Sequence, residues 1–254
     1  MKAKKSLGQN FLKSNLALKK IVEAGEIKNG DVILEIGPGK GALTAELLQA
    51  GAKVIAVEKD SELFEILKTK FAPQIELGSL VLVHDDILEF QASAYGLKPS
   101  AYKIIANIPY NITGAILKKF LTAEYQPTSM ILMVQHEVAK RIVAGDKKES
   151  ILSISVKAYG EPKMVMKVPA RYFSPAPKVD SAVIAIKNIS RKTFTENKVD
   201  EEKFWEIVKK GFAHKRKQLA GNLKGVVGNE ILVKFGQKRA EDLTLMDWMS
   251  IARA

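Results

Sequence analysis

Residues 107–110 read Asn-Ile-Pro-Tyr and directly follow an apolar run that ends at Ala106. Pro109 fixes its own backbone and disfavours helix at Ile108, so the carbonyl groups of this turn point in set directions. Asn107 adds a side-chain acceptor. Tyr110 adds a flat ring on which a base can stack, an interaction worth roughly 1 to 3 kcal/mol.

These groups suit the methylation of an exocyclic aromatic amine, whose nitrogen is a poor nucleophile because its lone pair is delocalised into the ring. Two fixed acceptors, the Asn107 side-chain oxygen and the Ile108 carbonyl, can hold the amine hydrogens and favour a pyramidal nitrogen facing a methyl donor. Positioning and electrostatics then supply most of the catalysis, without a strong base or a metal. The competing interpretation of Asn107 is an amide that only satisfies a loop.

A second candidate site is the glycine-rich stretch "EIGPGKGALT", with Gly37, Gly39 and Gly41. Glycines between a strand and a helix let the backbone approach a nucleotide-like ligand closely, so Gly37 and Gly39 are candidate cofactor contacts. Gly37, Gly39 and Ala42 also satisfy the dinucleotide fingerprint, which leaves the ligand open. The P-loop is excluded because Lys40 is followed by glycine. A glycine-rich turn without any ligand is the alternative.

Glu58 follows Gly37 at the end of the next apolar run and can accept hydrogen bonds from both ribose hydroxyls. This pattern fits NAD and S-adenosylmethionine equally well. Ligands of parallel α/β sheets bind beyond the carboxyl ends of the strands, and "NIPY" sits at such an end. The amine-holding groups at this position therefore favour S-adenosylmethionine.

The composition limits other chemistry. The 254 residues include no cysteine, so disulfides and thiolate metal sites are excluded, and a reducing, cytoplasmic location is expected. No metal motif is recognisable, since "HEVAK" has no second histidine and the three histidines are scattered along the sequence (His84, His136 and His214). The longest apolar runs are far shorter than the roughly 20 residues of a membrane span.

The charge is concentrated at the start of the sequence. The first twenty residues hold six lysines and no acid, within a formal net charge of +12: Lys2, Lys4, Lys5, Lys13, Lys19 and Lys20. A basic excess of this size indicates a polyanionic partner, most often nucleic acid. A lysine-rich solubilising surface is an equally good interpretation of the charge alone.

The elements that would position these groups alternate between strand and helix. A helix is expected to start at Ser14, with Leu16, Ile21 and Val22 on its apolar side. Apolar runs predict strands at 31–37, 53–58, 79–84, 102–106 and 129–134, and the segments between and after them predict helices at 42–51, 61–71, 112–121 and 136–144. Strands that are apolar throughout and separated by helices indicate a parallel sheet covered on both faces. The closely spaced runs 163–168 and 181–186 are expected to form an antiparallel edge.

After a polar stretch from Asn188 to Glu202 the pattern is purely helical. Apolar residues recur at helical spacing: Phe204, Ile207, Val208, Phe212, Leu219 and Leu223. Thr244 and Asp247 resemble a capping box ahead of Trp248. The sequence therefore predicts an α/β, Rossmann-like domain over residues 1–188 and a small all-α C-terminal domain over residues 189–254.

Eight motifs together resemble the ribosomal RNA adenine N6-dimethyltransferase family, in the same order and over nearly the whole sequence: "SLGQNFL", "LEIGPGKGALT", "VEKD", "HDDIL", "NIPYNIT", "MVQHEVAKRI", "FSPAPKVDSAV" and "FAHKRKQLAGNL". The resemblance implies an S-adenosylmethionine-dependent methyltransferase that dimethylates adenosines. It further implies action on an assembling small ribosomal subunit, as a monomer.

The resemblance also assigns roles to single residues. Contacts to the cofactor are implied for Asn10, Leu12, Gly37, Glu58, Asp86 and Asn107. Asn107 would also serve the target amine, and Tyr110 and Phe173 would hold a flipped adenine. The adjacent Asp85 leaves the register at Asp86 open. The catalytic set is thus expected to comprise Asn107, Ile108, Pro109, Tyr110 and Phe173, with Phe173 alternatively a loop plug.

The run His214–Lys217 resembles the basic RNA-binding segment of the family, so Lys215, Arg216 and Lys217 are expected to bind RNA; a solvated helix face is the alternative. Lys215 stands where the family typically has arginine, which keeps the charge but loses the bidentate fork. "NIPYNIT" and "KRKQLAGNL" favour the small-subunit (16S) branch over the large-subunit enzymes of macrolide resistance. A non-catalytic mitochondrial transcription-factor relative usually carries a targeting segment, for which the residues before Ser6 leave no room. An NAD oxidoreductase is a more distant alternative, because the sequence has no recognisable catalytic arrangement of histidine or lysine.

Overall fold

The computed structural model describes residues 3–4, 7–144 and 148–253. Lys2 and Lys5 of the basic N-terminus, and Ser6 of "SLGQNFL", lie outside these ranges. Two compact units are present: Met1–Ala139 with Pro162–Ile189, and Lys140–Glu161 with Ser190–Ala254. The sequence predicts a single division after residue 188. In the structure, residues 140–161 instead group with the C-terminal unit. The role of each unit stays a prediction.

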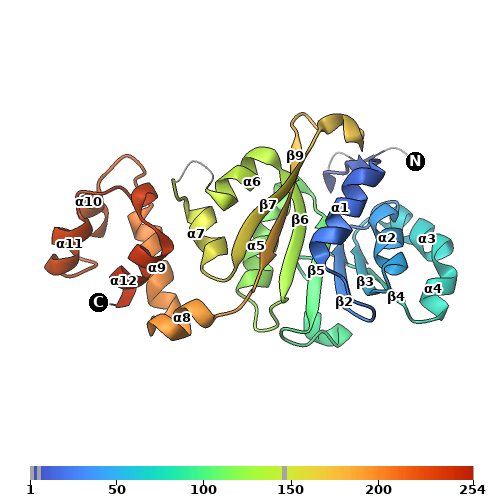
Figure 1. Ribbon diagram of the computed structural model, residues 1–254, viewed down its shortest axis with the longest axis horizontal. Coiled ribbons are helices and arrows are strands. Elements are labelled where there is room, and N and C mark those ends of the chain that lie inside the picture. Colours follow the sequence, from blue (N-terminus) through green and yellow to red (C-terminus); the bar gives the residue numbers. More distant parts are fainter. Residues whose placement is uncertain (1–2, 5–6, 145–147, 254) are drawn as a thin grey trace. The chain divides into compact units, whose positions relative to one another are not determined.

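The first unit is built on a seven-stranded sheet (Figure 1). In spatial order its strands are β4 (Leu80–His84), β3 (Lys53–Glu58), β2 (Val32–Ile36), β5 (Tyr102–Asn107), β6 (Ser129–Gln135), β9 (Ser181–Lys187) and β7 (Glu161–Val168). The five strands β2 to β6 are mutually parallel, as the apolar runs predicted. The chain order reverses between β2 and β5, and such a reversal is the usual place for a ligand crevice in α/β sheets.

The predicted helices are present: α1 (Asn15–Gly25), α2 (Ala42–Gln49), α3 (Ser61–Lys70), α5 (Thr113–Leu121) and α6 (His136–Val143). The short helix α4 (Ala72–Glu76) was not predicted, and the residues of α6 from Lys140 on belong to the second unit. Ile33, Ile105 and Ile131 of the sheet belong to one core cluster with residues of α1 and α2. Ser14 caps α1 by accepting a hydrogen bond from the Ala17 amide, so the predicted start is confirmed. Leu16, expected on the apolar side, is instead 59% exposed.

The two closely spaced runs are neighbouring strands at one edge of the sheet, as expected. β9 is antiparallel to β6 and lies between β6 and β7, so β7 alone forms this edge of the sheet. Because β9 is inserted in this way, its first residue, Ser181, pairs with Gln135 at the carboxyl end of β6. A second, two-stranded sheet pairs β1 (Phe11–Leu12) with β8 (Phe173–Ser174), which no periodicity in the sequence indicated.

The second unit is helical, as predicted, and consists of α7 (Ile151–Lys157), α8 (Lys192–Asn197), α9 (Glu201–Gly211), α10 (Leu219–Leu223), α11 (Asn229–Phe235) and α12 (Leu245–Arg253). Phe204 and Trp248 are fully buried in its core. The capping box is confirmed, because Thr244 and Asp247 exchange backbone-to-side-chain hydrogen bonds of 3.0 and 3.2 Å. The polar stretch from Asn188 to Glu202 contains α8, whose Phe194 is buried. None of the helices in the described part of the chain is long and apolar enough to cross a membrane.

Candidate active site

Four predicted site residues follow four neighbouring parallel strands. Gly37 follows β2, Glu58 ends β3, Asp86 lies just beyond β4, and Asn107 ends β5. Since the carboxyl ends of parallel strands meet at one edge of a sheet, these residues come together at the edge where the strand order reverses. A cavity of about 580 Å³ opens there, within the usual size range of small-molecule sites.

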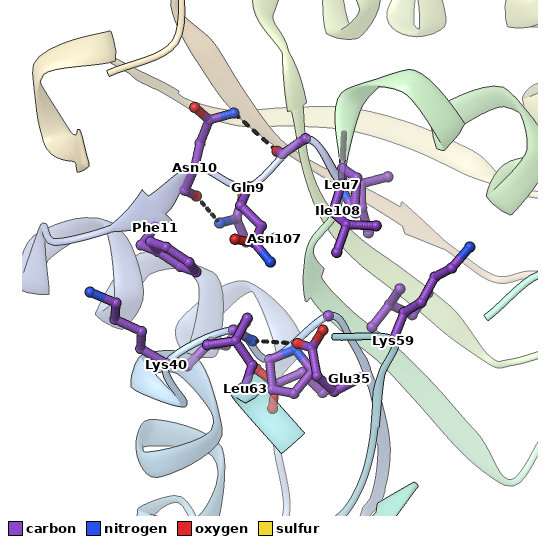
Figure 2. A pocket seen from close by; sticks show the side chains of 18 of the residues that line it. Leu7, Gln9, Asn10, Phe11, Glu35, Lys40, Lys59, Leu63, Asn107 and Ile108 are labelled. Carbon is purple, nitrogen blue, oxygen red and sulfur yellow. Dashed lines mark hydrogen bonds between the residues drawn. The ribbon is translucent and has the colours of Figure 1, made fainter. Parts of the chain in front are cut away.

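The cavity wall includes most of the predicted residues: Asn10, Leu12, Gly37, Gly39, Glu58, Asp85, Asp86, Asn107, Ile108, Pro109 and Tyr110. In Figure 2, Phe11, Asn107 and Ile108 lie on one side of this space, and Glu35 and Leu63 lie on the other. No group of three histidine, aspartate or glutamate side chains in the described ranges is arranged to hold a metal ion.

The glycine-rich turn requires glycine at three positions. Gly37, Gly39 and Gly41 have φ angles of 61°, 61° and 73°, which side chains with a Cβ rarely adopt. A Cβ on Gly41 would lie 2.4 Å from the Phe71 ring, so this glycine serves packing. A Cβ on Gly37 would meet no atom within 4 Å, and Gly37 therefore leaves open space at the cavity.

Glu58 holds the backbone around this turn. Its Oε2 accepts from the Gly39 amide at 3.0 Å and its Oε1 accepts from the Asp60 amide at 2.9 Å. The residue is 6% exposed, and burial raises the pKa of its carboxyl. Each carboxylate oxygen can accept two hydrogen bonds. Both oxygens therefore keep capacity for a hydroxyl in the cavity.

Asn107 has a free acceptor. Its Nδ2 donates to the Asn10 carbonyl at 3.1 Å, which fixes the orientation of the amide (Figure 2). Among the residues that the structure describes, none donates to the Asn107 Oδ1 or to the Ile108 carbonyl oxygen. Pro109 has φ −61° and ψ 130°, the extended conformation expected for this stiff turn. The two acceptors proposed from the sequence are thus both present and unused.

Residues 7–13 all line the cavity. Asn10 supplies the carbonyl that orients Asn107, and Leu12 is buried beside the cavity. A Cβ on Gly39 would lie 3.1 Å from the Phe11 ring, so this ring packs on the glycine turn. Lys40 Nζ lies 4.9 Å from the centre of the same ring, within range of a cation–π contact.

The start of the N-terminal segment is tied to α3. Lys4 Nζ and Gln9 Nε2 both donate to Asp60, each at 2.7 Å, and the hydrogen bond from Lys4 to Asp60 raises the pKa of Lys4. Lys4 is therefore engaged within the protein, and part of the N-terminal charge is not free for a polyanion.

Asp85 and Asp86 both line the cavity, so the predicted register at Asp86 remains a prediction. Asp86 Oδ2 accepts from Lys59 Nζ at 2.6 Å, and this hydrogen bond lowers the pKa of the carboxyl. Asp85 Oδ1 accepts from the Asp86 amide at 2.7 Å. Asp86 is thus held as a carboxylate with its position fixed by Lys59.

Glu35 is a cavity residue that the sequence analysis missed. It is 1% exposed at the end of β2, and burial raises the pKa of its carboxyl to about 8. Its Oε2 has no hydrogen-bond partner within the described ranges. A glutamate inside an otherwise apolar strand was the available signal, because buried ionisable groups concentrate at functional sites.

The two aromatic residues expected to hold a base differ in position. Tyr110 lines the cavity, and its hydroxyl lies 2.5 Å from Ser181 Oγ. Phe173 is 2% exposed and belongs to the core cluster, and its neighbour Ser174 lines the cavity instead. The burial of Phe173 is compatible with the alternative of a loop plug, and its stacking role stays a prediction.

The basic run of the second unit is exposed. Lys215, Arg216 and Lys217 lie in the turn between α9 and α10, and all three are exposed. They occupy a turn, although the alternative interpretation of this run had been a helix face. Residues 218 and 239 form an isolated antiparallel bridge, so the exposed Arg239 lies beside this turn. Nothing in the spacing of the sequence indicated that neighbour.

Comparisons with known proteins agree with this geometry. A sequence model described as ribosomal RNA adenine dimethylase matches residues 1–254. A ribosomal RNA small subunit methyltransferase A from Dehalococcoides mccartyi is 40% identical over 260 residues, covering 99% of this chain and 88% of that protein.

Two solved structures are similar over nearly the full length. A dimethyladenosine transferase from Plasmodium falciparum has a TM-score of 0.79 and 26% identity, with 95% of each chain covered. The 23S rRNA methyltransferase ErmE has a TM-score of 0.78 and 23% identity, with 96% of this chain and all of that chain covered. At that identity, the second comparison supports the fold alone.

Proposed function

The chain belongs to the ribosomal RNA adenine dimethylase family, and from this premise we propose that it transfers methyl groups from S-adenosylmethionine to N6 of adenosines in small-subunit rRNA. The observation that carries the proposal is the pair of unused acceptors, Asn107 Oδ1 and the Ile108 carbonyl, beside the cavity. The relatives named as small subunit methyltransferases favour this substrate over large-subunit rRNA.

The cavity fits the cofactor. Its volume lies in the range of small-molecule sites, Gly37 leaves open space, and Glu58 keeps acceptor capacity for the ribose hydroxyls. Asn10, Leu12 and Asp86 complete the set that would hold the cofactor. S-adenosylmethionine supplies an electrophilic methyl group on a sulfonium when bound.

The protein's own contribution is to hold the amine. Asn107 Oδ1 and the Ile108 carbonyl accept its two hydrogens, which draws the nitrogen toward a pyramidal geometry and frees its lone pair. The Asn107 side chain cannot rotate freely, because its amide nitrogen donates a hydrogen bond to the Asn10 carbonyl. Preorganised acceptors of this kind need no rearrangement during the reaction and act mainly on turnover. Tyr110 offers a ring for the extruded base.

The macromolecular substrate is an assembling small ribosomal subunit, and the enzyme acts as a monomer. The exposed cations Lys215, Arg216 and Lys217 bind rRNA phosphates. These cations do not read base sequence, so they provide affinity, and the pocket selects adenosine.

The proposal is tested by incubating the protein with isotope-labelled S-adenosylmethionine and either undermethylated small subunits or large-subunit rRNA. The RNA is then digested and its nucleosides are identified by mass spectrometry. Dimethyladenosine from the small subunit is the expected product. Dimethyladenosine only from large-subunit rRNA would move the protein to the other branch of the family.

Absence of methylated adenosine despite cofactor binding would refute the enzymatic role and favour a binding protein. The Asn107→Ala variant is expected to bind RNA yet lose most product. Asn197→Ala is the matched control, because Asn197 lies in α8 and its side chain donates to the Thr193 carbonyl of the same helix.

A further inference from the structure

Ser181 is a polar residue in an apolar setting. It is 0% exposed and begins β9, whose next five residues are the apolar run Ala182–Ile186. A buried hydroxyl costs free energy unless it finds a hydrogen-bond partner. The partner explains the serine, since Ser181 Oγ lies 2.5 Å from the Tyr110 hydroxyl.

Tyr110 is held at two ends. Its backbone follows Pro109 in the turn after β5, and the Thr113 hydroxyl donates to its carbonyl oxygen at 3.1 Å. Tyr110 lines the cavity, and its hydroxyl reaches Ser181 on another strand. The phenolic oxygen lies on the rotation axis of the Cβ–Cγ bond, so an anchor at each end fixes the direction of the side chain and the position of its ring.

The sheet topology produces this contact. β6 and β9 are antiparallel, and Ser181 therefore pairs with Gln135 at the carboxyl end of β6, next to the end of β5. A parallel strand in the same place would begin at the opposite edge of the sheet. The antiparallel insertion of β9 is thus what brings a serine next to the Tyr110 hydroxyl.

We propose that Ser181 is a positioning residue for the target base, acting by fixing the position of the Tyr110 ring. The inference rests on the proposed function, in which the base lies against that ring. Replacing both partners of a buried hydrogen bond by apolar groups is often nearly neutral for stability, so stability alone does not require this pair. The Ser181–Tyr110 hydrogen bond is explained if the position of the ring matters for holding the base.

The test compares Ser181→Ala, Tyr110→Phe and the double variant with the wild-type enzyme. Single-turnover methylation of undermethylated small subunits is measured at saturating S-adenosylmethionine, together with the Kd of S-adenosylhomocysteine and the Tm. Ser129→Ala is the matched control, because Ser129 is a buried serine at the amino end of β6, away from the cavity.

We expect each single variant to lower the methylation rate by about three- to tenfold, the effect of one lost hydrogen bond. The double variant should be no slower than either single variant, because both changes remove the same contact. The Kd of S-adenosylhomocysteine should stay at the wild-type value, and Ser129→Ala should methylate like wild type.

Wild-type rates in both single variants, or losses that multiply in the double variant, would overturn the proposal. If Ser181→Ala does not fold, Tyr110→Phe decides alone, since it keeps the ring and removes only the hydroxyl. A wild-type protein without any methylation would instead refute the proposed function, so the two failures are distinguishable.

Discussion

The buried carboxyl of Glu35 makes the stability of the first unit depend on pH. The pKa of this group is raised from its ordinary value of 4.5 to about 8 because burial disfavours the carboxylate. Between these values the native state holds a proton that the unfolded state has released, so stability falls as pH rises from 4.5 to about 8 and then levels off. At about 1.36 kcal/mol per pH unit, the full loss is about 5 kcal/mol.

Replacement of Glu35 by glutamine should remove this loss, because the amide is nearly isosteric and never ionises. Near pH 4.5 the free energy of unfolding should match that of wild type. At pH 8.5 the variant should be more stable by about 5 kcal/mol, and at pH 7 by about 3 kcal/mol. The side chain is 1% exposed, so solvent screening does not reduce these figures much.

Urea unfolding followed by far-UV circular dichroism at pH 4.5, 7 and 8.5 measures these differences. Tryptophan fluorescence provides a separate view, because Trp205 and Trp248 both belong to the second unit, which does not contain Glu35. Glu65→Gln, at an exposed position of α3, is the matched control and should follow wild type. Parallel pH profiles for wild type and Glu35→Gln would refute the assignment of the raised pKa to Glu35.

Three further predictions concern the proposed activity. Asn107→Ala should lower single-turnover methylation by about 10²- to 10³-fold while leaving the Kd for RNA unchanged, since the lost acceptor acts on the reacting amine; equal methylation would remove the central claim. Glu58→Gln should raise the Kd of S-adenosylhomocysteine, measured by calorimetry, by about tenfold or more. The reason is that glutamine has one acceptor oxygen where the carboxylate has two. An unchanged Kd would exclude the ribose role. Lys215→Ala with Lys217→Ala should reduce the salt slope of RNA binding by about 0.9 per lost phosphate contact. Lys53→Ala with Lys68→Ala, which removes the same charge from exposed positions of the first unit, should leave that slope unchanged.

The parallel sheet was predictable because its strands are buried on both faces, which produces continuous apolar runs. The acceptors at residues 107 and 108 were predictable for a related reason, since polar groups at the end of such a run stand out. Asp60, which anchors Lys4 and Gln9, was present in the motif "VEKD" and is a normal helix N-cap. Its contacts with the N-terminal segment join residues about 50 positions apart, and local sequence patterns do not predict contacts over such a separation.

Apart from Glu35, whose signal was local, the features that sequence reasoning missed depend on pairing between distant segments. The short pair β1 and β8 has two residues per strand, too few for any period to emerge. The burial of Phe173 follows from that pairing, because Phe173 is the partner of Leu12. The position of Ser181 beside Tyr110 follows from the antiparallel insertion of β9, which the sequence suggested only as an edge.

The second unit is assembled from two separate parts of the chain, and this affects synthesis. The last residue of the first unit is Ile189, so that unit has its whole sequence before the C-terminal helices have been translated. Residues 140–161 have to wait, because their partners come later: the Glu149 amide donates to the Glu241 carbonyl at 2.8 Å, and Tyr159 donates to Glu201 at 2.5 Å. Truncation after residue 188 would leave this segment without those partners. In a nascent chain on the ribosome, the sheet should therefore become resistant to proteases before α7 does.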